Sequence, residues 1–120
     1  MLDMNKIVHY EFSGKKVAKL KSFYEKVFQW KFNEVDTSGY WLMNSNNQGI
    51  SVGLEKQKEP LKNPLVYIDV DSIEDTIGEV VKNGGKVVIP KTQFIDRGFY
   101  AVIADIEGNL LGVWEKTSEK

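Results

Sequence analysis

The sequence predicts an α+β fold made of two tandem modules, each with the order strand, helix and three strands. Two observations support this prediction. The spacing of apolar residues changes between a strand period and a helix period in the same order from residue 7 and again from residue 65. The charged segment 55–64, which holds two of the three prolines, separates the two successions. Such matched halves indicate duplication, so we expect one domain over residues 1–120 with modules at about 7–56 and 64–116.

The first module contains a helix that passes directly into a strand. Val17, Leu20 and Tyr24 recur at helical spacing and give the helix one apolar face. Trp30 and Phe32 then alternate with polar residues, which is typical of a strand. The expected elements are a strand at 7–12, a helix at 16–28, and strands at 29–34, 40–43 and 50–54, with a turn at 36–39 and a polar loop at 44–49.

The second module repeats this order with different residues. Its helix begins near Asp71 and Glu74, which have the spacing of a capping box, and it ends at a pair of glycines. The segment 90–98, which contains Arg97, is expected to be a long loop. The two modules correspond best when residues 10–13 are set against residues 66–69. The expected elements are a strand at 65–70, a helix ending at 83–85, and strands at 86–89, 99–104 and 110–114.

Composition narrows the classes of function. The net charge is −1 and the isoelectric point about 5.9, so the chain lacks the basic surplus typical of nucleic-acid-binding domains. It contains no cysteine, which excludes disulfides and thiolate metal sites. No apolar run approaches the roughly 20 residues of a membrane span, and residues 1–6 carry no apolar signal region. We therefore expect a cytoplasmic protein that binds neither nucleic acid nor a membrane.

Five short motifs occur in a fixed order along nearly the whole chain. They are VHYEF at 8–12, FYEKVFQW at 23–30, VDSI at 70–73, GGKVV at 84–88, and DIEGN followed by LLGVWE at 105–115. In this order they resemble the vicinal oxygen chelate superfamily, which includes glyoxalase I, bleomycin-resistance proteins and extradiol dioxygenases. The resemblance implies one curved eight-stranded sheet, whose concave face forms a cup and whose convex face carries the helices. It also implies a homodimer.

The resemblance makes a metal site the first question. In active members of that superfamily, four side chains on strands one, four, five and eight hold a divalent metal ion, which acts as a Lewis acid on two substrate oxygens. The matching positions here are His9, Ser51 or Gly53, Leu65 and Gly112. Only His9 is a usual ligand, whereas zinc and transition-metal sites normally have three or four. We therefore predict no cofactor, with a divalent metal as the disfavoured alternative.

Alternation along the strands sorts side chains onto two faces, one apolar and one mixed. His9, the only histidine, shares a face with Glu11, and a histidine beside a carboxylate suits proton transfer near neutral pH. These two residues are the candidate catalytic groups. The candidate ligand-binding residues are Trp41, Ser51, Tyr67, Asp69, Tyr100 and Trp114. The alternative is a His9 that is only hydrogen-bonded, with the aromatic residues (including Tyr40 and Phe99) serving as core or dimer packing.

Three functions are compatible with these residues. The first is a protein that binds a small molecule in the cup without a metal, which the missing ligands favour. The second is a glyoxalase-like lyase or isomerase, or a dioxygenase-type enzyme, either metal-dependent or using His9 as an acid/base group. The third is a structural or regulatory module with a filled cup.

Overall fold

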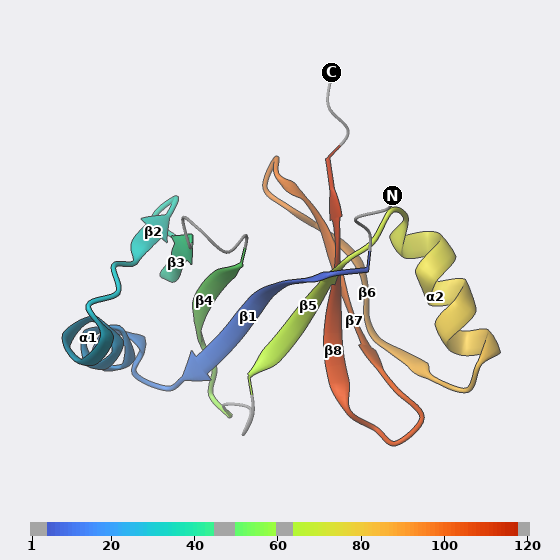
Figure 1. Ribbon diagram of the computed structural model, residues 1–120, viewed down its shortest axis with the longest axis horizontal. Helices are drawn as coiled ribbons and strands as arrows, with labels where there is room; N and C mark the ends of the chain where they lie inside the picture. The colour runs from blue at the N-terminus through green and yellow to red at the C-terminus, as the bar shows by residue number, and fades with distance from the viewer. Residues whose placement is uncertain (1–4, 45–49, 60–63, 118–120) are drawn as a thin grey trace. The chain divides into compact units, whose positions relative to one another are not determined.

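The computed structural model describes residues 5–44, 50–59 and 64–117, and it divides into two compact units (Figure 1). The N-terminal unit comprises residues 8–65, and the C-terminal unit comprises residues 66–120 together with 1–7. Among the described residues, each unit follows the order strand, helix and three strands. The predicted α+β fold class is therefore confirmed. Most of the polar loop at 44–49 and part of the segment 55–64 lie outside the described residues.

The N-terminal unit has four described strands in the order β2-β3-β4-β1. Its elements are β1 (Ile7–Gly14), α1 (Val17–Phe28), β2 (Asn33–Val35), β3 (Tyr40–Asn44) and β4 (Ser51–Lys56). β1 runs parallel to β4, and the other two pairings are antiparallel. The register of the parallel pair sets His9 opposite Ser51 and Glu11 opposite Gly53.

The apolar core of the N-terminal unit lies between α1 and one face of this sheet. Val17 of α1 and Phe32 pack with Val52 and Leu54 of β4, and Leu54 is completely buried. Successive side chains of a strand point to opposite faces, and Val52 and Leu54 point toward α1. Positions 51 and 53 therefore lie on the face of the sheet that α1 does not cover. Core packing thereby presents the polar residues of β4 on the other side of the sheet.

The predicted strand at 29–34 is wrong in its first four residues, since β2 begins only at Asn33. Gln29 ends α1 in the left-handed conformation, with φ of 61°. The chain then turns back, so that Trp30 stacks on Tyr24 with ring centroids 5.4 Å apart and also contacts Phe28 at 5.4 Å. The aromatic residues that suggested alternation pack against the helix they follow.

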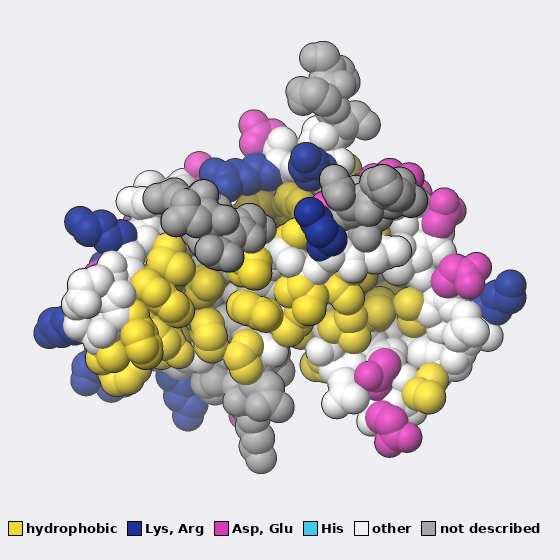
Figure 2. All heavy atoms as spheres, viewed as in Figure 1, with side chains coloured by type: hydrophobic (Ala, Val, Ile, Leu, Met, Phe, Trp, Pro, Cys, Tyr) yellow, Lys and Arg dark blue, Asp and Glu magenta, His cyan; other side chains and the backbone are white. Residues whose placement is uncertain are grey.

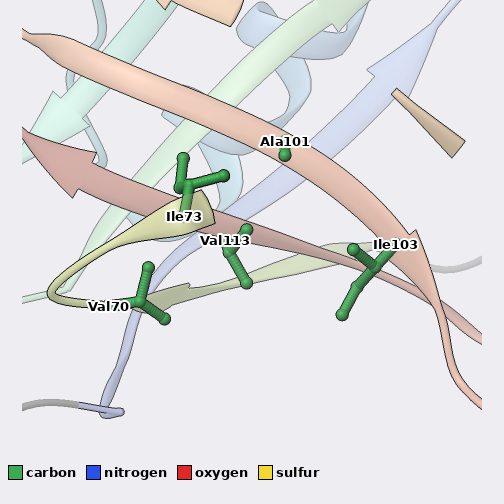
Figure 3. Packing of buried hydrophobic residues seen from close by; sticks show 5 residues of the cluster. All are labelled: Val70, Ile73, Ala101, Ile103 and Val113. Atoms are coloured by element: carbon green, nitrogen blue, oxygen red, sulfur yellow. The ribbon is translucent and has the colours of Figure 1, made fainter. Parts of the chain in front are cut away.

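The C-terminal unit has its strands in the order β5-β8-β7-β6. Its elements are β5 (Leu65–Asp69), α2 (Ile73–Lys82), β6 (Lys86–Phe94), β7 (Gly98–Ala104) and β8 (Leu110–Lys116). β5 is parallel to β8, with Tyr67 opposite Gly112. Between α2 and the sheet lies the cluster drawn in Figure 3, formed by Val70, Ile73, Ala101, Ile103 and Val113. Ile73 is completely buried.

Two details of the C-terminal unit differ from expectation. The segment 90–98 is not a long loop, because β6 extends to Phe94 and β7 begins at Gly98. Register shifts between Val87 and Thr92 interrupt the pairing of β6 with β7 and accommodate Pro90. The cap of α2 is Ser72 rather than Asp71, and its hydroxyl accepts a hydrogen bond from the N–H of Asp75 at 3.1 Å.

The two units differ in charge. Residues 8–65 carry nine Lys against six Asp and Glu, whereas the remaining residues carry seven Lys and Arg against eleven Asp and Glu. Figure 2 shows basic side chains around α1 and mainly acidic ones around α2. No helix within the described ranges is long and apolar enough to span a membrane.

Candidate functional site

A polar cluster joins β1 and β4 in the N-terminal unit. The Nδ1 atom of His9 lies 2.5 Å from Oγ of Ser51, its partner across the parallel strands. The Nε2 atom of the same ring lies 2.7 Å from Oε1 of Glu11, two residues along β1. The imidazole therefore bridges a hydroxyl and a carboxylate, one on each ring nitrogen.

Tyr40, the first residue of β3, completes the cluster. Its hydroxyl donates to Oε1 of Glu11 at 2.8 Å and lies 3.2 Å from Nε2 of His9. Gly53 makes this contact sterically feasible, because a Cβ there would overlap the Tyr40 hydroxyl and lie 2.6 Å from Oε1 of Glu11. We call His9, Glu11, Tyr40 and Ser51 the His9 cluster.

The carboxylate of the cluster is largely withdrawn from water. Glu11 is 8% exposed and is the buried charged residue among those described. Burying a carboxylate is costly unless it is hydrogen-bonded, and here His9 and Tyr40 both meet the same oxygen. Within the described residues, no buried side-chain nitrogen or oxygen lacks a partner. The hydrogen bonds thus offset the cost of burying the acid.

Burial and the carboxylate of Glu11 both affect the pKa of Glu55, which lies near the end of β4. Partial burial raises the pKa of Glu55, and the negative charge of Glu11 raises it further, while a hydrogen bond with Gln57 opposes the shift. The residue as a whole is nevertheless exposed.

The partners of His9 indicate its neutral tautomer. When Glu11 is ionised and the imidazole is neutral, Glu11 can only accept hydrogen bonds, so the proton of the ring lies on Nε2. Nδ1 is then the acceptor, and the Ser51 hydroxyl donates to it. The ring nitrogen facing Ser51 is accordingly the basic one. This assignment follows from the chemistry of the partners.

The structure brings four of the predicted ligand-binding residues together in the C-terminal unit. Their strands pair Asp69 with Trp114, Trp114 with Tyr100, and Tyr67 with Gly112. Ala101 and Val113 pack toward α2, so alternation places these four side chains on the other face of the sheet. A Cβ at Gly112 would overlap the ring of Tyr67. The backbone N–H and C=O of Asp69 pair with Lys6 and Asn5.

Trp41 lies apart from the His9 cluster. It packs against the buried residues beneath α1, and Nζ of Lys21 sits 4.8 Å from the centre of its ring. Its neighbour Tyr40 points the other way and reaches Glu11. Sequence patterning treated Tyr40 only as one of several aromatics. The signal that could have found it is the glycine at 53, which leaves room for a side chain from the next strand.

The residues present do not fit the four-ligand metal site that the resemblance implies. Of the two alternatives at the strand-four position, Ser51 is hydrogen-bonded to His9 and Gly53 is covered by the Tyr40 hydroxyl. Gly112, at the strand-eight position, is covered by the Tyr67 ring. Both nitrogens of His9 already have partners. In the part of the chain that the structure describes, no group of three or more His, Cys, Asp or Glu residues could hold a metal ion.

Comparison with known proteins identifies related sequences. A family model described as the Glyoxalase/Bleomycin resistance protein/Dioxygenase superfamily matches residues 6–113. Two curated proteins, provisionally named glyoxylase CFP32, from Mycobacterium bovis and Mycobacterium tuberculosis, are 27% identical over 105 residues. This match covers 79% of the chain but only 40% of the length of those relatives.

Solved structures share the fold at lower identity. A glyoxalase/bleomycin resistance protein/dioxygenase superfamily member from Vibrio splendidus has a TM-score of 0.67 at 17% identity, covering 93% of this chain and 99% of that one. The Mn(II)-bound glyoxalase from Novosphingobium aromaticivorans has a TM-score of 0.71 at 16% identity, covering 98% of this chain and 42% of that one. These likenesses establish the fold.

Proposed function

Because the chain belongs to the Glyoxalase/Bleomycin resistance protein/Dioxygenase superfamily, we propose that it binds a small molecule at the His9 cluster without a metal held by the protein. One observation carries the proposal. Both nitrogens of His9 are engaged by Ser51 and Glu11, on the sheet face that α1 leaves uncovered. Polar residues are costly to bury where apolar ones would pack, so their presence on this face favours a binding role.

The chemistry of the cluster indicates what the small molecule carries. Ser51 and His9 remain partly exposed, so a ligand can reach them. The Ser51 hydroxyl has two acceptor lone pairs besides the proton that it donates to His9, so it can accept a hydrogen bond from a ligand N–H or O–H group. In the C-terminal unit, the face that carries Tyr67, Asp69, Tyr100 and Trp114 is proposed as a surface for planar or apolar groups.

His9 makes a direct test feasible. It is the only histidine, so the imidazole resonances in a nitrogen-15 NMR spectrum report on this site alone. We would first titrate untagged protein with Mn²⁺, Ni²⁺ and Zn²⁺ alone, then with a panel of small phenols and carboxylic acids. We expect the imidazole signals and the melting temperature to respond to a member of the panel and not to the metals.

A matched variant sharpens the test. His9→Ala should abolish the thermal shift given by the responding compound, whereas Trp41→Phe, on the helix side of the sheet, should retain it. A stoichiometric metal in the purified protein that is lost in His9→Ala would refute the metal-free proposal. It would instead favour a metal-dependent lyase or isomerase.

Acid/base catalysis is the second candidate function, favoured by the 2.7 Å contact between His9 and Glu11. The curated relatives are named as glyoxylases, which adds support. A histidine fixed by a carboxylate can move protons to and from a bound substrate. If so, His9→Gln should retain binding of the compound found above and lose its conversion, with the pH dependence of the rate also lost.

We also propose that the protein forms a homodimer. Phe23, Val27 and Phe28 of α1 are all more than half exposed, and such exposed apolar residues favour a contact surface. Light scattering should then give twice the chain mass of 13.7 kDa. A mass of one chain at micromolar concentration would refute the dimer.

A further inference from the structure

We propose that Ser51 is a nucleophile whose hydroxyl is activated by His9, with Glu11 orienting the imidazole. This inference goes beyond binding, since a ligand can occupy the site without reacting. Ser51, His9 and Glu11 form a continuous line of hydrogen bonds of 2.5 and 2.7 Å through the two ring nitrogens. A hydroxyl next to a base that is itself held by an acid is the arrangement that nucleophilic catalysis requires.

The direction of the proton follows from the tautomer. Glu11 and the Tyr40 hydroxyl surround Nε2 of His9, so the proton of the ring lies there and Nδ1 is the base. Nδ1 can therefore accept the proton of Ser51 as its oxygen attacks an electrophile. In serine hydrolases the serine faces Nε2 instead, but either nitrogen serves because the ring delocalises the charge.

The positions of the groups are set by the sheet. Ser51 and His9 lie directly opposite each other on neighbouring parallel strands, and Glu11 is two residues along the same strand. Sites built on strands hold their geometry better than sites on loops. The 15% exposure of the His9 side chain and the partial exposure of Ser51 leave a route for a small electrophile.

The class of substrate is an acyl compound with a good leaving group, such as an aryl ester. Oγ of Ser51 forms a bond to the acyl carbon, the bond to the aryl oxygen breaks, and the serine proton passes through His9 to the departing aryl oxygen. Water then attacks the acyl carbon and gives one proton to His9. The bond between that carbon and Oγ of Ser51 breaks, Oγ takes the proton back from His9, and the free acid leaves. β4 lies between β1 and β3, so its backbone N–H groups are used within the sheet. A stable leaving group lessens the need for an oxyanion hole.

The test uses p-nitrophenyl acetate on the full chain, followed by mass spectrometry of peptides. Ser72 is the matched internal control, because its oxygen caps α2 and has no basic partner among the contacts described. We expect Ser51 to acquire a hydroxylamine-sensitive acetyl group at least about tenfold faster than Ser72. Hydroxylamine distinguishes this ester from acetylated lysines.

Two variants complete the test. His9→Gln should lower the Ser51 acetylation rate at least about tenfold, and Ser51→Ala should remove the label and the burst of p-nitrophenol. Circular dichroism of each variant verifies folding. Labelling of Ser51 no faster than Ser72, or a rate unchanged in His9→Gln, would overturn the proposal. Ligand-induced shifts of the imidazole resonances would still be expected after that outcome. The labelling experiment therefore tests the reaction, and the NMR titration tests binding independently.

Discussion

The two units place a glycine beneath a tyrosine at equivalent positions of their sheets. Gly53 on β4 lies opposite Glu11, and Gly112 on β8 lies opposite Tyr67. This register is the correspondence of residues 10–13 with 66–69 that the sequence suggested. The residue opposite the glycine on the first strand is therefore an acid, Glu11, in the N-terminal unit and an aromatic residue, Tyr67, in the C-terminal unit.

This difference separates chemistry from packing. In the N-terminal unit the space above Gly53 admits the Tyr40 hydroxyl, which binds the buried Glu11. In the C-terminal unit the space above Gly112 is filled by the ring of Tyr67. The residue two before Glu11 is His9, whereas the residue two before Tyr67 is the buried Leu65. A duplicated scaffold thus concentrates its titratable groups in one half.

The two helices differ in how their N-termini are capped, and here the C-terminal unit has the more polar contacts. α2 begins with a Ser72 cap, and the N–H of Ile73 donates to Glu115 at 2.8 Å. α1 has no side-chain cap at Lys16 and no acid in its first turn, and it depends on aromatic contacts such as Tyr24 with Trp30. The unit that carries the polar cluster therefore has the less well capped helix.

The largest effects should come from the largest completely buried side chain of each unit. Leu54→Ala and Ile73→Ala each remove the centre of a helix–sheet cluster, and each should lower the free energy of unfolding by about 2–5 kcal/mol. Urea unfolding followed by tryptophan fluorescence measures the loss, because Trp30 and Trp41 lie in the N-terminal unit and Trp114 lies in the C-terminal unit. A loss below about 1 kcal/mol in either variant would show that its cluster is not the core described here.

Alanine at the two glycines tests the comparison directly. Gly53→Ala should displace the Tyr40 hydroxyl from Glu11 and lower the free energy of unfolding by about 1–3 kcal/mol, because a buried carboxylate loses a donor. Gly112→Ala should cost a similar amount through displacement of the Tyr67 ring. Only Gly53→Ala should move the imidazole resonances of His9. Equal movement in both variants would contradict the separation of chemistry from packing.

Tyr40→Phe should have a smaller effect, about 1 kcal/mol, because it removes the contacts of the hydroxyl with Glu11 and His9 without changing the packing of the ring. The spectrum of His9 should still show the tautomer with the proton on Nε2, because Glu11 stays in place. Tyr10→Phe is the control, since alternation puts Tyr10 on the helix side of β1. A proton on Nδ1 in the wild-type protein would contradict both the assignment and the proposed role of Ser51.

The sequence predicted the order of elements better than their ends. Apolar periodicity depends on burial, so it identified both helices and all eight strands that the described residues contain. It failed at Trp30 and Phe32, whose alternation arises from packing onto the preceding helix, and at Pro90, which an irregular edge strand tolerates. Neither contact is visible in a local pattern.

The candidate site was predictable on the strands that alternate regularly. His9, Glu11 and Ser51 were correctly placed on one face, because the parity of β1 and β4 is undisturbed. Tyr40 and Glu55 were not predicted as part of the site. The contact of Tyr40 with Glu11 depends on the pairing of β4 with β3, and that of Glu55 depends on where β4 ends. Trp41 and Tyr40 lie on opposite faces of β3, so a shift of one residue in the register would exchange their positions.

The smallest effect concerns pH and compares Glu55 with Asp105 of the C-terminal unit. The pKa of Glu55 is raised above 4.5 by burial and by Glu11, so the folded state binds its proton more tightly than the unfolded state. Its contribution to stability is therefore fully present below pH 4.5 and is lost as pH rises through the raised value. Glu55→Gln should flatten the fall in stability above pH 4.5, as measured by urea unfolding between pH 4 and 8.

Asp105 has the opposite sign and provides the control. Hydrogen bonds from the side chain and backbone of Asn109 lower the pKa of Asp105 below 3.8, so its contribution is lost as pH falls through the lowered value. Asp105→Asn should change only the acid limb of the stability curve and leave the limb above pH 4.5 as it is. If Glu55→Gln left that upper limb unchanged as well, the charge of Glu11 would not reach the end of β4, and the polar cluster would end at Tyr40.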